Sequence, residues 1–473
     1  MDSEILRQLP SVDQLLNAAE RAGLIGEHGR EMVRNAARAV LEQARAQIAH
    51  GSAALPDSRE HATDLIVGQI AGYLQEAARR SLRRAVNATG IIIHTGLGRA
   101  VLPRTAAEAV AEVLGGYCNL AVDPDTGQRG HRDSHVVGLL CELTGAEAAT
   151  MVNNNAAATM IILNTLAKGK EVIVSRGQLV EIGGSFRMPE VMEGSGAILR
   201  EVGTTNKTYL SDYLNAIGDN TGAILRVHQS NYRIIGFTEQ PPLEDLVRVG
   251  HEHNLPVIDD LGSGALLDMK DFGLAHEPMV QESIRAGADV VCFSGDKLIG
   301  GPQAGVIVGQ AAVIEKIKKN PLARALRVGK MTISALEATL RLFLSRDRLL
   351  SENPTYRMLS LPLSKLDERA QSVAEALREV LSGVAEIAVI DGASEVGSGS
   401  VPAEEIPTRL LSVRPTAVST QTLARSLRHY APPIFARVHK DAVLFDFRTL
   451  QAEEDGIVCA ALRALLANEA TSE

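Results

Sequence analysis

A lysine stands just beyond a buried, β-branched run in the second half of the chain, where a cation is costly to place. The run Asp289–Phe293 leads through Ser294 and Asp296 to Lys297, and a glycine turn and another apolar run follow. Lysine is rarely set against a core unless it does chemistry, and forming a Schiff base with pyridoxal phosphate is a standard use. A lysine in a surface loop at a sheet edge is the ordinary alternative, and the strand–turn–strand context fits it less well.

Two adjacent acids, Asp259 and Asp260, follow a second buried run, Pro256–Ile258. Ligands of open α/β folds bind at the carboxyl ends of parallel strands. A carboxylate in that position can keep a pyridinium nitrogen protonated, which makes the ring an electron sink. An acidic helix cap before Gly262 is the ordinary alternative, and the residues alone do not choose between the two aspartates.

Three asparagines, Asn153–Asn155, open an alanine-rich stretch that is typical of a helix. The unpaired N–H groups and the positive dipole end of a helix start form a ready phosphate site, although asparagine is also a good N-cap. Phosphate site, acid and lysine occur in the chain order used by fold-type-I pyridoxal-phosphate enzymes, which is far more specific than any one motif. The residues predicted to hold this cofactor are Asn154, Asn155, Asp259 or Asp260, Ser294 and Lys297.

Arginines form a further candidate site, for an anionic substrate. Arg99 lies in a glycine-rich segment, and residues 315–330 carry six lysines and arginines against one glutamate. Arg324 and Arg327 are three residues apart, so on a helix they share a face and could hold a tetrahedral oxyanion bidentately. A solvated basic helix is the alternative, and we accept it for the lysines of this stretch.

An α/β body must position these residues. Between Val86 and about Gly309, short β-branched runs alternate with alanine-rich helical stretches such as Leu243–His253 and Pro278–Ala286. This alternation predicts βαβ units and a largely parallel sheet covered on both faces. The runs that read as strands are Glu171–Val174, Ala223–Val227, Pro256–Ile258, Asp289–Phe293 and Gly305–Val308.

The chain divides into three predicted domains, at residues 1–84, 85–335 and 336–473. The first reads as a small helical domain with helices at Val12–Ala22, Glu27–His50 and Arg59–Arg84, broken around Gly51–Pro56. The last reads as a small α+β domain, entered through a bridging helix at Met331–Arg346. Its expected elements are a helix at Lys365–Leu381, strands at Ile387–Ile390, Arg409–Val413 and Ala442–Phe447, a terminal helix at Glu454–Ala467, and a loop at Asp391–Pro402.

Composition limits the kinds of partner that the protein can have. The 473 residues carry a formal net charge of −9 and contain 8 Phe, 7 Tyr and no Trp. These figures argue against a general nucleic-acid coat and against base-stacking modules. Residues 1–84 differ, because they hold eleven arginines, eleven acids and no lysine, and end on a basic run. An RNA partner would be recognised by shape and backbone, and a solvated helix face is the alternative for that run.

Other types of site do not match the sequence. Lys297 lacks the glycines and the following hydroxyl residue of a P-loop, and Gly96 and Gly98 lack the third glycine of a dinucleotide fingerprint. His251 and His253 face apart on a helix, and the four cysteines are widely spaced, so neither a metal site nor a disulfide framework is expected. The N-terminus has no signal-peptide core and no run could span a membrane, so we expect a cytoplasmic protein with no membrane partner.

Long strings of the chain resemble the bacterial selenocysteine synthases, the L-seryl-tRNA(Sec) selenium transferases. The resemblance runs through essentially the whole chain, including the helical N-terminal segment. The strings that carry it most clearly are VNATGIIIHTGLGRA (Val86–Ala100), LNTLAKGKEVIVSRGQLVEIGGSFR (Leu163–Arg187), HQSNYRIIGFT (His228–Thr238), DDLGSG (Asp259–Gly264), SGDKLIGGPQAG (Ser294–Gly305) and LRVGKMTISALEATLRL (Leu326–Leu342).

The resemblance implies an aspartate-aminotransferase-like fold of type I and a pyridoxal-phosphate reaction on serine esterified to tRNA(Sec). Lys297 would hold the cofactor as a Schiff base and then act as base for the Cα proton, while Asp259 or Asp260 holds the ring nitrogen. Loss of the serine hydroxyl would leave an aminoacrylyl ester, to which selenium from selenophosphate adds to give selenocysteinyl-tRNA(Sec).

The resemblance also gives the arginines and the N-terminal domain a use. The substrate carboxylate is an uncharged ester, so Arg99, Arg324 and Arg327 are free to bind selenophosphate. Members of the family form large ring-shaped homo-oligomers, here expected to be a decamer, with sites at subunit interfaces and with the N-terminal domain on the tRNA. The rival functions are a pyridoxal-phosphate β-eliminating lyase acting on a small amino acid, and a non-catalytic tRNA-binding scaffold.

Overall fold

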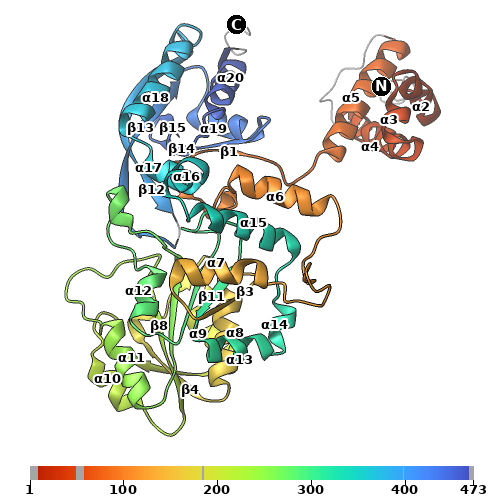
Figure 1. Cartoon of the computed structure of the whole chain (residues 1–473). Helices are drawn as coiled ribbons and strands as arrows, with labels where there is room; N and C mark the ends of the chain where they lie inside the picture. Colours follow the sequence, from red (N-terminus) through yellow and green to blue (C-terminus); the bar gives the residue numbers. More distant parts are fainter. Residues whose placement is uncertain (1–8, 50–57, 184–185, 398, 468–473) are drawn as a thin grey trace. The chain divides into compact units, whose positions relative to one another are not determined.

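A computed structural model describes residues 9–49, 58–183, 186–397 and 399–467 of the chain, which form two compact units, Met1–Arg84 and Ala85–Glu473 (Figure 1). Each unit has a hydrophobic core of its own. None of the helices in these ranges is both long and apolar enough to cross a membrane. The break predicted around Gly51–Pro56 lies outside the described residues.

The described part of the first unit is helical, as the sequence predicts. Its helices are α2 (Val12–Arg21), α3 (Leu24–His28), α4 (Arg30–Ala49) and α5 (Arg59–Ala78). Ser11 starts α2 with a capping box, because its hydroxyl accepts from the Gln14 N–H while the Gln14 side chain accepts from the Ser11 N–H. The inward-facing leucines, isoleucines and valines of three helices form one core: Leu15, Leu16, Val33, Leu41, Ile70 and Leu74.

Two helix ends of this unit differ from the expected ones. The helix expected from Glu27 is divided by Gly29, whose positive φ of 81° favours glycine and departs from helical backbone. Helix α5 ends at Ala78, so the basic run Arg79–Arg84 follows the helix and is not its last turns. These arginines therefore lie on irregular chain that joins the two units in sequence.

A seven-stranded sheet is the centre of the second unit. Its strand order is β3-β11-β10-β9-β8-β4-β7, and every pair is parallel except the two that β11 makes. The predicted largely parallel sheet is thus confirmed. The strands are β3 (Ala148–Val152), β4 (Glu171–Ser175), β7 (Ile198–Val202), β8 (Thr221–Val227), β9 (Val257–Gly262), β10 (Val290–Ser294) and β11 (Gly305–Gly309).

Two hydrophobic cores cover the two faces of this sheet, because successive side chains of a strand point to opposite faces. Val257 of β9 joins the core that contains α7 (Ser134–Thr144), α11 (Leu243–Glu252) and α12 (Val280–Arg285). Ile258, the next residue, joins the core that contains α8 (Asn155–Ala167), α9 (Met188–Ser195) and α13 (Ala311–Lys319). This alternation decides where the following two aspartates point.

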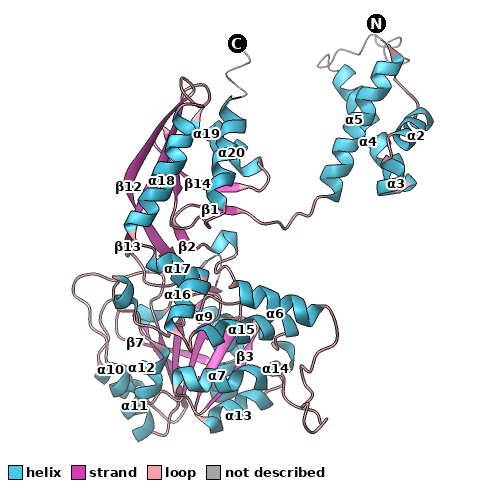
Figure 2. Ribbon diagram, turned by 45° about the horizontal axis from the view of Figure 1, so that its top comes forward, coloured by secondary structure: helices cyan, strands magenta, loops and turns pink. Residues whose placement is uncertain are grey.

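A second, six-stranded sheet is built mainly from the C-terminal part of the chain. Its order is β1-β14-β15-β13-β12-β2. Helices α18 (Leu363–Arg378), α19 (Thr420–His429) and α20 (Glu454–Ala467) share one core with it (Figure 2). The strands are β1 (Val86–Ala88), β2 (Ile91–Ile93), β12 (Ala385–Gly397), β13 (Glu405–Pro415), β14 (Ile434–His439) and β15 (Ala442–Asp446).

The loop expected from the sequence at Asp391–Pro402 is wrong for Asp391–Gly397. Those residues continue β12, which pairs with β13 along Ala385–Glu395 and with β2 at Glu395 and Gly397. The glycines are there for space, since a Cβ at Gly392 would lie 2.4 Å from the Leu410 side chain. Strands β1 and β2 also come from the range assigned to the large domain, so the C-terminal sheet takes both of its edge strands from the chain's first half.

The bridging helix expected at Met331–Arg346 is two helices in the structure. Helix α15 spans Lys330–Leu342, and α16 begins at Arg346 and ends at Glu352. Ile333, Leu336 and Leu340 of α15 pack into the core of the large sheet. The helix thus belongs to the body that carries Lys297.

Candidate active site

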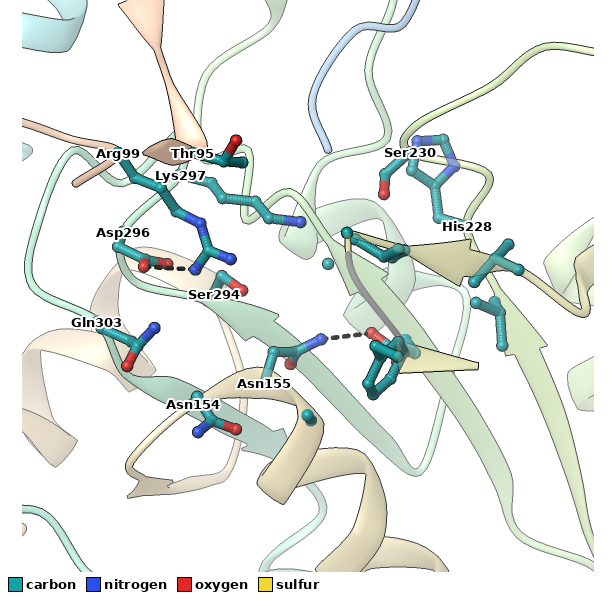
Figure 3. A pocket seen from close by; sticks show the side chains of 18 of the residues that line it. Thr95, Arg99, Asn154, Asn155, His228, Ser230, Ser294, Asp296, Lys297 and Gln303 are labelled. Carbon is teal, nitrogen blue, oxygen red and sulfur yellow. Dashed lines mark hydrogen bonds and ion pairs between the residues drawn. The ribbon is translucent and has the colours of Figure 1, made fainter. Parts of the chain in front are cut away.

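Lys297 lies at the wall of a cavity of about 510 Å³ at the carboxyl ends of β8, β9 and β10. Its side chain reaches into this cavity beside those of Arg99 and Ser294 (Figure 3). The residue is only 6% exposed. Burial lowers the pKa of the Lys297 amine, Asp260 opposes that shift and Arg99 adds to it. A lowered pKa leaves more of the amine neutral, which is the form that attacks a carbonyl carbon or takes a proton.

Only one of the two predicted aspartates lines the cavity. Asp260 does, and its two carboxylate oxygens accept from Asn155 Nδ2 and Thr159 Oγ1, each at 2.8 Å. Asp259 points to the opposite face of the sheet, where it accepts from Ser283 Oγ at 2.6 Å and from Arg226 at 3.3 Å. The alternation along β9 therefore assigns the cavity to Asp260.

Asp260 is buried, and its surroundings act on its pKa in opposite directions. Burial raises the pKa of the Asp260 carboxyl, while the hydrogen bonds from Asn155 and Thr159 and the charge of Lys297 pull it down, and the net direction is upward. A carboxylate with a raised pKa is a good partner for a protonated ring nitrogen, because both gain from neutralising each other in a dry site.

Helix α8 begins at the cavity wall. Asn154 is its N-cap and accepts from the Ala157 N–H at 2.9 Å, so the capping role that the sequence offered as an alternative is present. Asn154, Asn155 and Ala156 also line the cavity. The first N–H groups of a helix have no intrahelical acceptor, and together with the helix dipole they favour an anion here.

Arg99 is held in the same cavity by strained backbone and an ion pair. Its φ of 62° is left-handed, and its N–H donates to the His94 carbonyl at 3.0 Å. Its guanidinium donates to Asp296 Oδ2 at 2.8 Å, next to Lys297. The other Asp296 oxygen is buried and has no hydrogen-bond partner among the residues that the structure describes.

The structure places Arg324 and Arg327 elsewhere. Both line a second cavity, of about 640 Å³, together with Arg129 and Arg132. Burial lowers the pKa of Arg132, and the like charges of Arg327 and Arg324 lower it further. Within one copy of the chain, the three predicted arginines are thus divided between two cavities.

Three residues of the site were not found from the sequence. Thr159 lies one helical turn after Asn155, a spacing that puts both on one face of α8. His228 directly follows β8, so the rule that led to Asp260, a polar residue at a strand's carboxyl end, would have found it too. Glu277, which bonds His228, lies in a loop with no sequence signal.

Comparison with known proteins gives matches over both units. A family model described as L-seryl-tRNA selenium transferase matches residues 85–451, and one described as the N terminal of selenocysteine synthase matches residues 6–45. The chain is 48% identical to the L-seryl-tRNA(Sec) selenium transferase of Desulfomicrobium baculatum over 465 residues, which cover 98% of this chain and 100% of that protein. For the enzyme of the same name from Nitratidesulfovibrio vulgaris, the identity is 47%, with 98% and 99% covered.

Among solved structures, D-glucosaminate-6-phosphate ammonia-lyase is similar in fold. Its TM-score is 0.57 at 21% sequence identity, and the match covers 84% of this chain and 98% of that one. With the family match to residues 85–451, this confirms the predicted fold class, the α/β fold of type I with a helical N-terminal unit and a sheet-rich C-terminal part.

Proposed function

Because the chain belongs to the L-seryl-tRNA selenium transferase family, we propose that it converts L-seryl-tRNA(Sec) to L-selenocysteinyl-tRNA(Sec) with pyridoxal phosphate as its cofactor. The observation that carries the proposal is the buried Lys297 at the carboxyl edge of the sheet, in one cavity with Asp260 and the start of α8. A reaction on aminoacyl-tRNA belongs in the cytoplasm.

The residues of the cavity fit pyridoxal phosphate. Lys297 offers a buried amine for the aldehyde, Asp260 a buried carboxylate for the ring nitrogen, and Asn154, Asn155 and Ser294 polar groups around the helix start for the phosphate. The space is there as well, since the cavity that these residues line has a volume of about 510 Å³. When bound, the cofactor supplies an electron sink for the substrate's Cα.

The side chains of the cavity divide the remaining work. The Lys297 amine, with its lowered pKa, is the base that takes the Cα proton. Asp260 keeps the charge of the ring nitrogen balanced, and Asn155 and Thr159 keep Asp260 in place. Arg99 has no substrate carboxylate to bind, because the carboxyl group is esterified to tRNA, so it serves the second substrate.

We assign the second substrate, selenophosphate, to the arginines. A guanidinium fork matches the oxygens of a phosphate, and Arg99 stands beside the lysine where selenium must arrive. Arg324 and Arg327 line another cavity of the same chain, so they reach this site only from a second copy. We therefore propose that the site is completed in a homo-oligomer, a decameric ring by resemblance.

The N-terminal unit is the proposed tRNA contact. The unit holds eleven arginines and no lysine, and a basic run of irregular chain follows α5. Arginine side chains suit contacts with a phosphate backbone. This unit also favours the transferase over a lyase acting on a small amino acid, which needs no such domain.

Lys297→Ala should abolish both the chemistry and the colour of the enzyme. We expect purified wild-type protein to be yellow from its Schiff base and to convert seryl-tRNA(Sec) in the presence of selenophosphate. The variant should show neither the absorption band nor conversion, and Lys270→Ala, on a surface turn, should show both. Wild-type protein that stays colourless after incubation with pyridoxal phosphate would refute the proposal.

Substitution of the two aspartates should affect different properties, the conversion rate for Asp260 and the unfolding free energy for Asp259. We expect Asp260→Asn to lower the conversion rate by about 10²-fold or more, because a neutral amide no longer holds the ring nitrogen protonated. Asp259→Asn should lose about 1–3 kcal/mol of unfolding free energy instead, since it weakens buried bonds to Ser283 and Arg226. Conversion assays and denaturant titrations distinguish the two, and the opposite pattern would reverse the assignment.

Removing residues 1–84 should abolish binding of seryl-tRNA(Sec) while the Schiff-base absorption persists. The reason is that the cofactor residues all lie in the second unit, Ala85–Glu473. Filter binding and absorption spectra measure the two properties. Unchanged tRNA affinity in the shortened protein would favour the small-substrate lyase.

Inactive variants should complement each other if two copies share one site. Mixed oligomers of Lys297→Ala and Arg324→Ala subunits should recover about a quarter of wild-type activity. In an equal mixture, half of the neighbouring pairs contain one subunit of each kind, and one of the two shared sites in such a pair keeps both residues intact. A mixture of Arg324→Ala with Arg327→Ala is the matched control and should recover none. No recovery in the first mixture would place the complete site within one chain.

A further inference from the structure

His228 stands on the cavity wall with its backbone and its ring both fixed. It directly follows β8, and its N–H donates to the Asp260 carbonyl at 2.9 Å. Its Nε2 lies 3.1 Å from Glu277 Oε1, and its side chain is 18% exposed. Figure 3 shows His228 on the wall near Ser230, on the side of the cavity toward which Lys297 extends.

Glu277 is a buried carboxylate that holds this ring. It is 2% exposed, and its second oxygen accepts from the Val401 N–H at 3.2 Å. Burial raises the pKa of the Glu277 carboxyl, but the hydrogen bond and charge of His228 and the bond from Val401 outweigh it, so the pKa lies below its ordinary value. A buried anion fixed on both sides can orient an imidazole and stabilise its protonated form.

The cavity needs a proton donor, and its other charged groups are occupied. Hydroxide is a poor leaving group, so departure of the serine oxygen calls for a general acid. Among the described residues that line the cavity, five have titratable side chains: Arg99, His228, Asp260, Asp296 and Lys297. Arg99 and Asp296 pair with each other, Asp260 is bonded by Asn155 and Thr159, and Lys297 is the base.

We propose that His228 donates the proton to the departing serine hydroxyl and that Glu277 is its positioning residue. The inference rests on the proposed function. The Cα–H bond breaks, its proton goes to Lys297, and its electron pair becomes the Cα–Cβ π bond. The Cβ–O bond breaks with its pair on oxygen, which takes the Nδ1 proton of the protonated His228 ring, whose Nε2 is held by Glu277, and leaves as water. His228 then regains a proton from solvent.

The test varies the leaving group. His228→Gln should lower conversion of seryl-tRNA(Sec) by about 10²- to 10⁴-fold, the usual contribution of a general acid. Conversion of the same tRNA charged with 3-chloroalanine should fall by less than about 10-fold in this variant, because chloride leaves without a proton. Equal losses with both substrates would overturn the role of His228. If wild-type protein converts neither substrate, the proposed function itself fails.

Two histidines serve as matched controls. His251 makes a similar pair outside the cavity, with Nε2 at 3.2 Å from Asp289 Oδ2, so His251→Gln should convert both substrates at the wild-type rate. His94 lines the neighbouring cavity, and its buried Nδ1 has no hydrogen-bond partner within the described part of the chain. A leaving-group-dependent loss in His94→Gln, and none in His228→Gln, would assign the donor to His94 and overturn the proposal.

Glu277→Gln tests the positioning role without relying on turnover. Hydrogen–deuterium exchange at the imidazole C2 position, followed by mass spectrometry of the full chain, gives a pH midpoint for each histidine. In the variant the midpoint of His228 should move to lower pH, because an anion beside the ring is lost, and that of His251 should stay. The other charged groups of the cavity, Arg99, Asp260, Asp296 and Lys297, are unchanged.

Conversion by Glu277→Gln should fall selectively for the hydroxyl substrate, and Glu277→Asp, which keeps the charge, should recover part of it. An unchanged His228 midpoint, or a loss equal for the hydroxyl and chloride substrates, would show that Glu277 only supports the fold.

Discussion

Three aspartates and one lysine are buried at one edge of the large sheet, and the site depends on how the aspartates are partnered. Asp259, Asp260, Asp296 and Lys297 are each at most 6% exposed. An unpaired charge in such a place costs several kcal/mol. Each aspartate therefore takes a partner from another element: Ser283 of α12 for Asp259, Asn155 and Thr159 of α8 for Asp260, and Arg99 from the loop after β2 for Asp296. Lys297 is the fourth buried group, and its burial lowers the pKa of its amine.

The C-terminal part of the chain packs beside Lys297. The chain after β12 packs on the lysine so tightly that a Cβ at Gly399 would lie 2.3 Å from Lys297 Nζ. Two residues later, the Val401 N–H reaches Glu277, which in turn holds His228. Val401 itself has a φ of 45°, a costly conformation for a β-branched residue that persists only where surrounding contacts impose it. The second sheet thus shapes the active site, although its strands carry none of the residues that do the chemistry.

The three predicted arginines do not meet in one cavity of a single chain. Arg99 belongs to the lysine's cavity, while Arg324 and Arg327 gather with Arg129 and Arg132 in another. Like charges crowded together repel, so a cluster of this kind favours an anion that neutralises it. The proposed site, shared between two copies of the chain, would place this cluster beside an anionic substrate.

The sequence by itself determined the class of fold, the helical N-terminal unit, and the place of Lys297 just beyond a buried strand, because these depend on local patterns: apolar runs of strand length, helical periodicity, and a cation next to a buried strand. Only the tertiary structure decided which aspartate enters the cavity, since that follows from the face of the sheet on which β9 places each residue. Glu277 likewise could be found only in the tertiary structure, which brings its loop against His228 at the end of β8. The mistaken loop at Asp391–Gly397 has the same origin, because glycine favours turns locally but also provides the room that closely packed neighbouring strands require.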